Sequence, residues 1–388
     1  MKRGCPLEFG CLKKNLMRSL SKYTAKSFIL LFLCCLTFNL HARTAPIHVA
    51  FVGPAPSTSS YWKNTMIPMA EAARQLNIKI TFHHPSYEQR FNLTPLIEKV
   101  LSAKQKPDYL ISVFRDINAI KLLTIVEKYR TPFISISTSV SRIEQSKTGK
   151  PQQYFKYWLA QITADDISSG RLMAAELYQT SKQVTPEAKV NLLAIGGNKI
   201  FEASRLRDLG LQQEVENHQD LAFLQLVHTD WQIDTAKNKS EKLFNRHKKI
   251  DAIWTANADI ALAVVDVLQQ ATGIKPPLIG TVDWTKKAFD AIDKNHLSFS
   301  LGSNHLHGLW ALIMFHDLAH GYQLSAESDQ NITTKYLKAD KENLTEIRPF
   351  LTPSHWKKVD ITQYSKVFNQ TLKTYDFDFS HMLDKGRK

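Results

Sequence analysis

Cysteine is scarce in this chain of 388 residues: the four that occur lie among the first 35, at Cys5, Cys11, Cys34 and Cys35. The rest of the chain can form no disulfide, so its stability must come from a buried hydrophobic core, which a chain of this length can supply. The sequence contains neither a G-x-S-x-G nucleophile elbow nor a G-x-G-x-x-G fingerprint. These two absences argue against an exported α/β hydrolase, which we keep as the alternative of another class, and against a dinucleotide-binding domain.

Residues 1–42 have the layout of an export signal. They hold seven Lys or Arg and one Glu, followed by an uncharged, mostly apolar run over residues 27–40 and a small residue at Ala42. The run has 14 residues, whereas a membrane-spanning helix needs about 20. We therefore expect a signal peptide over residues 1–42, cleaved after Ala42, and a mature protein in the periplasm. An uncleaved N-terminal anchor and a start at Met17 are the alternatives.

The positive charge of the chain is scattered. The formal net charge is +14, of which the first 42 residues carry +6 (seven bases less one acid), so about +8 remains on the mature part. The bases form no stripe with interleaved aromatic residues, which nucleic-acid binding would favour. A scattered basic surface is typical of a solvated face, and we expect no nucleic-acid partner.

Runs typical of buried parallel strands alternate with helical patterns, first over residues 47–137 and again over residues 166–302. Parallel strands joined by helices predict an α/β fold, and two such sets predict two doubly wound parallel-sheet lobes. Residues 341–388 are rich in aromatic side chains and predict a helical appendage packed on one lobe. The expected strands cover residues 47–53, 78–84, 108–114, 132–137, 190–197, 221–228, 251–257, 277–284, 297–302 and 332–339.

Polar and aromatic side chains follow most of the expected strands. In doubly wound sheets ligands bind at the carboxyl ends of the strands, so these side chains should share one region. Carboxylate, amide and guanidinium groups beside aromatic rings suit a neutral ligand with many hydroxyls, because each hydroxyl both donates and accepts a hydrogen bond. The candidate ligand-binding residues are Ser59, Tyr61, Trp62, Ser137, Arg207, Asn257, Asp259, Asp283 and His305.

Five motifs, in this order, resemble the ribose- and galactose-type periplasmic binding proteins, which have the type 1 periplasmic binding fold. The resemblance runs from about residue 49 to residue 321 and implies a non-enzymatic, monomeric receptor without cofactor or metal. It also implies a hinge of three crossings, near Ser139, Leu301 and Glu327. The motifs are SSYW, DDISSGRLMAAEL, GNKIFEASRLRDLGL, IDAIWTANADIALAVVDVL and LIGTVDW.

These crossings imply the extent of each lobe. The N-terminal lobe would comprise residues 46–138 and 303–326, and the C-terminal lobe residues 139–302 and 327–340. The appendage would then comprise residues 341–388. The closed receptor would present a sugar-like ligand to an ABC permease or to a membrane sensor kinase or cyclase.

The same resemblance implies roles for several candidates, and the sequence departs from it in two places. Arg207, in an R-x-x-G pattern, would bind ligand oxygens, and Tyr61 and Trp62 would stack on the ligand. Ser137 and Thr138 stand where sugar binders often have an Asp-Arg pair. Parts of the sequence also resemble the autoinducer-2 receptors, a second interpretation. That branch has another arginine where this chain has Gly302.

Two histidines and two aspartates outside the expected ligand site have structural interpretations. His316 and His320 are four residues apart, as in the H-E-x-x-H zinc motif, but Asp317 replaces the glutamate and the helix is strongly apolar. We expect packing there and no metal. Asp165 and Asp166 begin a helix, where capping is the expected role.

Overall fold

The computed structural model describes residues 45–54, 59–86, 92–115, 117–271, 275–324 and 327–386. Residues Ile47–Lys388 form one compact unit. The expected signal peptide lies outside the described residues. Within the described residues, no helix has both the length and the apolar character to cross a membrane.

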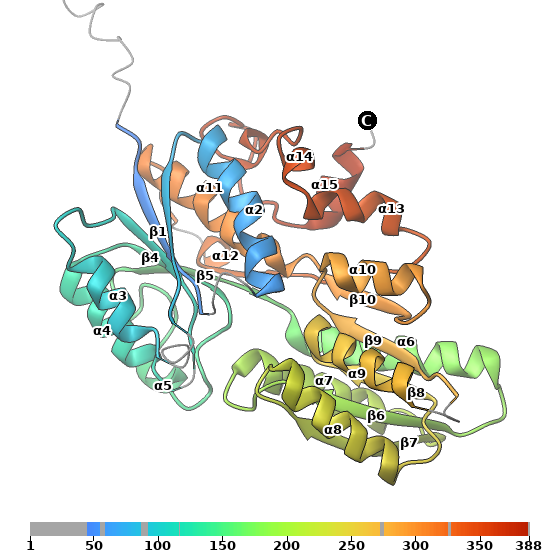
Figure 1. Cartoon of the computed structure of the whole chain (residues 1–388). Coiled ribbons are helices and arrows are strands. Elements are labelled where there is room, and N and C mark those ends of the chain that lie inside the picture. Colours follow the sequence, from blue (N-terminus) through green and yellow to red (C-terminus); the bar gives the residue numbers. More distant parts are fainter. Residues whose placement is uncertain are drawn as a thin grey trace, which may run out of the picture. The chain divides into compact units, whose positions relative to one another are not determined.

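The first sheet belongs to lobe 1, the N-terminal lobe, and all its strand pairs are parallel, as the continuous apolar runs predict. Helices α2 (Ser60–Gln75) and α11 (His307–Ala319) cover one face and α3 (Thr94–Leu101) and α4 (Ala119–Tyr129) the other (Figure 1). The strand order is β11 (Asn331–Thr334), β5 (Trp158–Ala164), β4 (Phe133–Ser137), β3 (Tyr109–Ser112), β1 (His48–Val52) and β2 (Lys79–His83).

The second sheet belongs to lobe 2 and is parallel except for its edge strand β12, which pairs antiparallel with β10. Helices α6 (Asp166–Val184) and α7 (Glu202–Glu216) pack together, as do α8 (Ile233–Arg246) and α9 (Ala258–Gln270), and α10 (Lys286–Asp293) packs beside α9. The strand order is β12 (Leu337–Ala339), β10 (Phe299–Gly302), β9 (Leu278–Val282), β8 (Ala252–Thr255), β6 (Val190–Gly196) and β7 (Leu221–His228).

The two doubly wound lobes agree with the expected fold class, but the strand pairing moves their boundaries. Strand β5 pairs with β4 and with β11. Strands β5 and β11 therefore belong to the sheet of lobe 1, whereas the expected crossings near Ser139 and Glu327 would put these two strands in lobe 2. The expected strand over residues 332–339 is divided between the two sheets. The crossings therefore lie at Asp165, at Ser303 and at residues 335–336.

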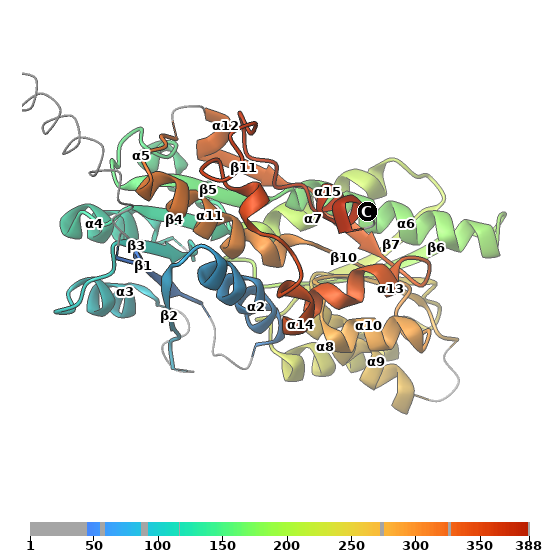
Figure 2. The ribbon, with the colours of Figure 1, turned by 90° about the horizontal axis from the view of Figure 1, so that it is seen from above.

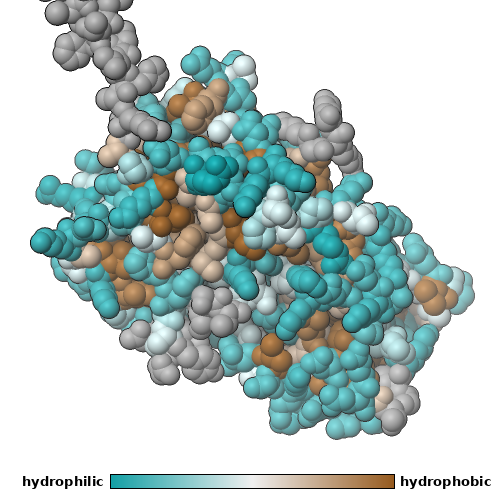
Figure 3. Space-filling view, turned by 45° about the horizontal axis from the view of Figure 1, so that its top comes forward, coloured by the Kyte–Doolittle hydropathy of each residue, from teal (hydrophilic) through white to brown (hydrophobic). Residues whose placement is uncertain are grey.

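The C-terminal segment, which we define as residues 344–386, contacts both lobes, whereas we expected it on one. It comprises α13 (Leu344–Ile347), η2 (Arg348–Leu351), α14 (Pro353–Trp356), η3 (Thr362–Tyr364) and α15 (Phe379–Gly386). Figure 2 shows α14 beside α2 of lobe 1 and α13 beside α10 of lobe 2. The face of the molecule in Figure 3 is mostly hydrophilic, with apolar residues in small separate patches.

Candidate ligand-binding site

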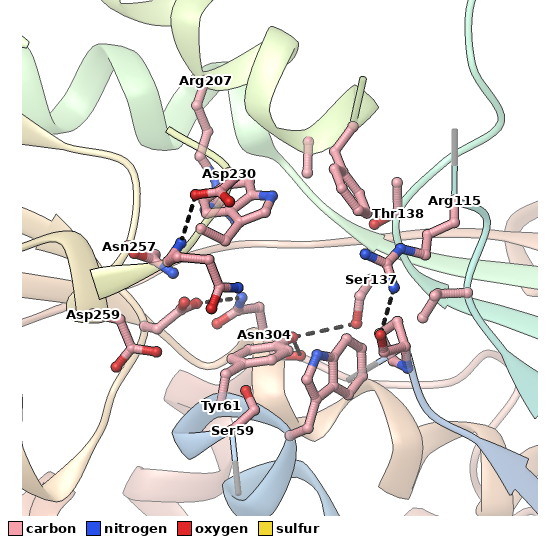
Figure 4. A pocket seen from close by; sticks show the side chains of 18 of the residues that line it. Ser59, Tyr61, Arg115, Ser137, Thr138, Arg207, Asp230, Asn257, Asp259 and Asn304 are labelled. Carbon is pink, nitrogen blue, oxygen red and sulfur yellow. Dashed lines mark hydrogen bonds between the residues drawn. The ribbon is translucent and has the colours of Figure 1, made fainter. Parts of the chain in front are cut away.

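A cavity of ≈ 580 Å³ lies at the carboxyl ends of the strands and is lined by residues of both lobes (Figure 4). This is the region where ligands bind to doubly wound sheets. Lobe 1 contributes Pro54, Ser59, Tyr61, Trp62, Val113, Arg115, Ser137 and Thr138, and the crossing contributes Asn304. Lobe 2 contributes Phe201, Ala203, Arg207, Asp230, Trp231, Gln232, Ile233, Asp234, Asn257, Asp259 and Asp283.

Close packing of α6 and α7 brings Arg207 to the cavity beside a buried partner. A Cβ atom on Gly170 would lie 2.0 Å from the carbonyl oxygen of Arg207, and one on Gly210 would lie 1.9 Å from that of Ile167. Both glycines are therefore required for this approach. Gly210, the glycine of the R-x-x-G pattern, thus allows α7 to pack closely on α6. This packing positions Arg207 at the cavity.

The guanidinium of Arg207 is held by three groups. Its Nε donates to Asp166 Oδ1 at 2.8 Å, one terminal nitrogen donates to the Ala256 carbonyl oxygen at 2.7 Å, and the other to the Tyr336 hydroxyl at 2.9 Å. Tyr336 also donates to Asp166 Oδ1 at 2.8 Å. A guanidinium has five N–H donors, so two remain without a partner among the residues that the structure describes and can serve a ligand.

Burial opposes the charge of Arg207, but Tyr336, Asp166 and Asp283 outweigh it and raise the arginine's pKa above its usual value. Asp166 was expected to cap its helix together with Asp165. Asp165 does so, because its side chain accepts from the backbone nitrogen of Ser168 at 3.0 Å. Asp166 instead turns inward and pairs with Arg207, so the capping expectation is corrected for this residue.

Asp283 is a buried carboxyl at the end of β9, in a left-handed backbone conformation with φ = 79°. Its Oδ1 accepts from Asn304 Nδ2 at 3.1 Å. Burial raises the pKa of Asp283 to about 6, although Arg207 and the bond from Asn304 work in the opposite direction. Such a strained, desolvated carboxyl has to be maintained by its surroundings and is typical of a functional site.

Asn257 and Asp259 flank the start of α9 at the cavity wall. The side-chain oxygen of Asn257 accepts from the backbone nitrogen of Ile260 at 2.9 Å and so caps the helix. Its amide nitrogen remains on the cavity side as a donor. Burial raises the pKa of Asp259, which Lys287 partly offsets.

Lobe 1 supplies aromatic surface and hydroxyls. The Tyr61 hydroxyl lies 3.3 Å from Ser137 Oγ and donates to the Asn304 carbonyl oxygen at 3.2 Å. Burial raises the pKa of Tyr61 well above its usual value, so this group stays neutral. Trp62 packs against Tyr61 and Phe51, with ring centroids 4.9 Å and 5.9 Å apart, and Ser59 lines the cavity beside them.

Twelve of the twenty cavity residues that the structure describes were not on the candidate list, and those that offer charge or an aromatic ring at the cavity wall include Arg115, Phe201, Asp230 and Trp231. Arg115 donates to the Pro54 carbonyl oxygen, and its guanidinium lies 5.0 Å from the ring centroid of Phe201 in the opposite lobe. Trp231 has φ = 68°, and a Cβ on Gly197 would lie 1.9 Å from its ring. Position after a strand end was the signal that could have identified all four.

His305 does not line the cavity, which corrects its place among the candidates. It is 1% exposed and lies beside Trp284, with ring centroids 6.0 Å apart. Burial lowers its pKa to about 3. The other eight candidates all line the cavity.

The position of Gly302 has no room for the arginine found in autoinducer-2 receptors. A Cβ there would lie 2.4 Å from the ring of Trp284. Elsewhere, the described residues include no group of three or more His, Cys, Asp or Glu that could hold a metal ion. His316 instead lies beside His320 and stacks on Phe368, as expected of a packed helix.

Comparisons with known proteins agree with the fold. A crystal structure of a periplasmic sugar-binding protein from Pseudomonas fluorescens superposes with a TM-score of 0.74 at 22% identity, covering 86% of this chain and 97% of that chain. A solute-binding protein of an ABC transporter from Actinobacillus succinogenes 130z, with bound D-allose, gives 0.68 at 16% identity, covering 77% and 99%.

A third such protein, from Bacillus halodurans C-125 with bound myo-inositol, gives a TM-score of 0.64 at 18% identity, covering 80% of this chain and 100% of that chain. A search of curated protein sequences gave no significant match. The family model of the periplasmic binding protein domain matches residues 49–314, which is more than half of the chain. The chain therefore belongs to the periplasmic binding protein domain family.

Proposed function

We propose that this protein is a non-enzymatic periplasmic receptor that closes over a neutral, polyhydroxylated small molecule such as a sugar or a cyclitol. The observation that carries the proposal is the composition of the cavity, in which Arg207, Asp283 and Asn257 of lobe 2 face Tyr61 and Trp62 of lobe 1. The polar groups offer donors and acceptors in fixed directions, and the rings offer flat apolar surface. A polyol ring uses both kinds of contact at once.

The division of this wall between two lobes supports a receptor that changes conformation. A ligand favours the closed form only if it binds that form more tightly, and contact with both lobes provides the difference. The Arg115 guanidinium already lies over the ring of Phe201 across the cleft. The bound D-allose and myo-inositol of two structural neighbours support the ligand class.

In this proposal the closed receptor delivers its ligand to an ABC permease. The alternative partner is a membrane sensor, to which the closed receptor would report that ligand is bound. Uptake of radiolabelled ligand by a deletion strain separates the two. Loss of uptake supports import, and normal uptake with loss of a ligand-dependent response supports sensing. The lack of space at Gly302 disfavours an autoinducer-2-type ligand.

Thermal unfolding with a panel of sugars, cyclitols and autoinducer-2, including D-allose and myo-inositol, tests the ligand class. A ligand at 100 times its Kd stabilises the folded state by about 2.7 kcal/mol, so a rise in Tm is expected for at least one polyol. Mass spectrometry of small molecules released from protein purified from its own periplasm identifies the native ligand.

Asp283→Asn should reduce the rise in Tm, and Asp266→Asn should not. Asp266 lies in the same lobe, but its side chain is 50% exposed and pairs with Lys237 outside the cavity. An absence of any rise across the panel would contradict the proposal. A rise that Asp283→Asn leaves unchanged would place the ligand elsewhere.

A further inference from the structure

Asp283 is connected to the C-terminal segment through its neighbour Trp284. The indole of Trp284 is buried, and its Nε1 donates to the Ser300 carbonyl oxygen at 3.1 Å. Ser300 Oγ in turn donates to the carbonyl oxygen of Asp283 at 2.9 Å. The backbone of Asp283 is therefore held from the Trp284 side, and its carboxyl is held by Asn304.

Trp284 is enclosed by aromatic rings. On the side of lobe 2 lies Phe289 of α10, with its ring centroid 6.1 Å from that of Trp284. On the side of the crossing lies His305, with its ring centroid 6.0 Å away. Phe379, the first residue of α15, is closest at 5.2 Å, with its ring at 65° to the indole. Phe379 is 3% exposed. Its ring therefore fills space that would otherwise let the indole change its position.

The segment that carries Phe379 is attached to lobe 2 by Arg348. This guanidinium donates to Asp290 at 2.8 Å and to Asp293 at 2.5 Å, both on α10. Phe350 of the same turn packs against Phe379, with ring centroids 4.8 Å apart.

The same segment is attached to lobe 1 by a buried carboxylate. Asp317 of α11 accepts from the hydroxyl of Ser365, from the backbone nitrogen of Lys366 at 2.7 Å and from the hydroxyl of Tyr375 at 3.2 Å. The ammonium of Lys366 donates to Asp329 at 2.8 Å. Buried groups with this many partners fix the position of the segment.

Lobe 1 also contacts Trp284 directly, because Asn64 of α2 donates to the Trp284 carbonyl oxygen at 2.9 Å. Trp284 is thus in contact with both lobes, with the crossing and with α15. From this arrangement we propose that the C-terminal segment is part of the binding apparatus: Phe379 positions Trp284, and Trp284 positions the carboxyl of Asp283. Phe379 is a positioning residue and does not touch the ligand. The consequence for ligand binding rests on the proposed function.

The proposal can be tested without a ligand by ¹⁹F NMR of protein labelled with 5-fluorotryptophan. The chain has seven tryptophans, and Trp284→Phe assigns the signal of Trp284. We expect this signal to move with pH around the pKa of Asp283, about 6. The charged groups that influence Asp283 are Arg207, Asp259 and Asp166, none of them in the C-terminal segment.

In Phe379→Ala we expect the Trp284 signal to shift or split and its pH midpoint to move by ~0.5 unit or more. Phe379→Leu, which refills the space, should restore the wild-type signal in large part. The matched control is Phe368→Ala: Phe368 belongs to the same segment but is 56% exposed and stacks on His316. It should leave the Trp284 signal unchanged.

A chain that ends at Asp378 is the second variant, because it lacks α15 but keeps both attachments of the segment. It should reproduce the effect of Phe379→Ala. An unchanged Trp284 signal and midpoint in both variants would overturn the proposal, and so would an equal change in Phe368→Ala. Neither result depends on ligand binding, so a failure here leaves the proposed function standing. The NMR comparison likewise tests the role of Phe379 even if the protein binds none of the ligands in the panel.

Discussion

The two walls of the cavity differ in how their side chains are held. On lobe 2, Arg207 and Asp283 are buried ionisable side chains with hydrogen-bond partners. Arg207 donates to Asp166 and to Tyr336. Asp283 accepts from Asn304. On lobe 1, neutral groups dominate: Tyr61, Trp62 and Ser137 offer rings and hydroxyls. The lobe 2 wall is therefore organised before any ligand arrives.

The difference follows from the cost of burying charge. An ion removed from water is tolerated only with excellent geometry and further hydrogen bonds, so the charged wall needs a supporting network. Rings and hydroxyls need less support, because a tyrosine hydroxyl is satisfied by one or two neighbours. We infer that lobe 2 fixes the orientation of the ligand and that lobe 1 completes its burial on closure.

Removing Arg207 should have the largest effect on stability. Arg207→Ala leaves Asp166 buried without its cation, and breaking such a pair costs about 3–5 kcal/mol of unfolding free energy. Urea denaturation of the ligand-free protein measures this. Ligand affinity should also fall, because a hydrogen bond to a charged group contributes about 1.5–3 kcal/mol.

Lys237→Ala is the matched control, since Lys237 lies in the same lobe but is 37% exposed and pairs with Asp266, which is 50% exposed. It should cost less than about 1 kcal/mol. Adding Asp166→Asn to Arg207→Ala should recover part of the loss, because the unpaired charge is removed. Equal losses for Lys237→Ala and Arg207→Ala would show that the lobe 2 wall is not organised by the pair of Arg207 and Asp166.

Asp283 should have the next largest effect, through pH. Its folded pKa is about 6, against about 3.9 for an unfolded aspartate. The folded state thus binds the proton more tightly, so stability falls as pH rises from about 4 to 6 and is about 2–3 kcal/mol lower above that window. We expect Asp283→Asn to be more stable than wild type at pH 7.5 and nearly equal at pH 4.

The measurement is urea denaturation of both proteins between pH 4 and pH 7.5, followed as the difference in unfolding free energy. Asp266→Asn, which removes an exposed carboxyl of the same lobe, is the control. A difference for Asp283→Asn that does not change with pH would mean that its carboxyl is not desolvated in the folded protein, and the contrast between the walls would weaken.

The sequence predicted the sheets and most of the cavity for the same reason. Runs such as residues 47–53 and 251–257 are mostly apolar because their strands are buried on both faces. The polar residues that follow such strands lie at the carboxyl ends of the sheet, where ligands bind. Strand β5 escaped because WLAQITA alternates in burial and follows an irregular stretch. Its omission shifted the expected lobe boundary.

Side-chain contacts between residues far apart along the chain were not predicted from the sequence. Asp166 and Arg207 are 41 residues apart, and nothing local distinguishes Asp166 from Asp165, which does cap its helix. His305 looked accessible because it follows a strand, yet it is buried beside Trp284 and does not line the cavity. Packing of this kind depends on the folded arrangement of several elements, so motif spacing alone did not reveal it.

The smallest effect should come from Ser137, on the neutral wall. Its φ of 66° is a left-handed conformation that a glycine adopts without strain. Ser137→Gly should relieve about 1 kcal/mol of strain while losing a hydrogen bond of similar value to Tyr61, which retains the Asn304 carbonyl. The net change should stay within about 0.5 kcal/mol, whereas Ser137→Ala, which loses the bond without relief, should cost about 1 kcal/mol. Urea denaturation of the two variants side by side checks this. A loss in Ser137→Gly as large as that in Arg207→Ala would mean that the neutral wall is held as firmly as the charged one.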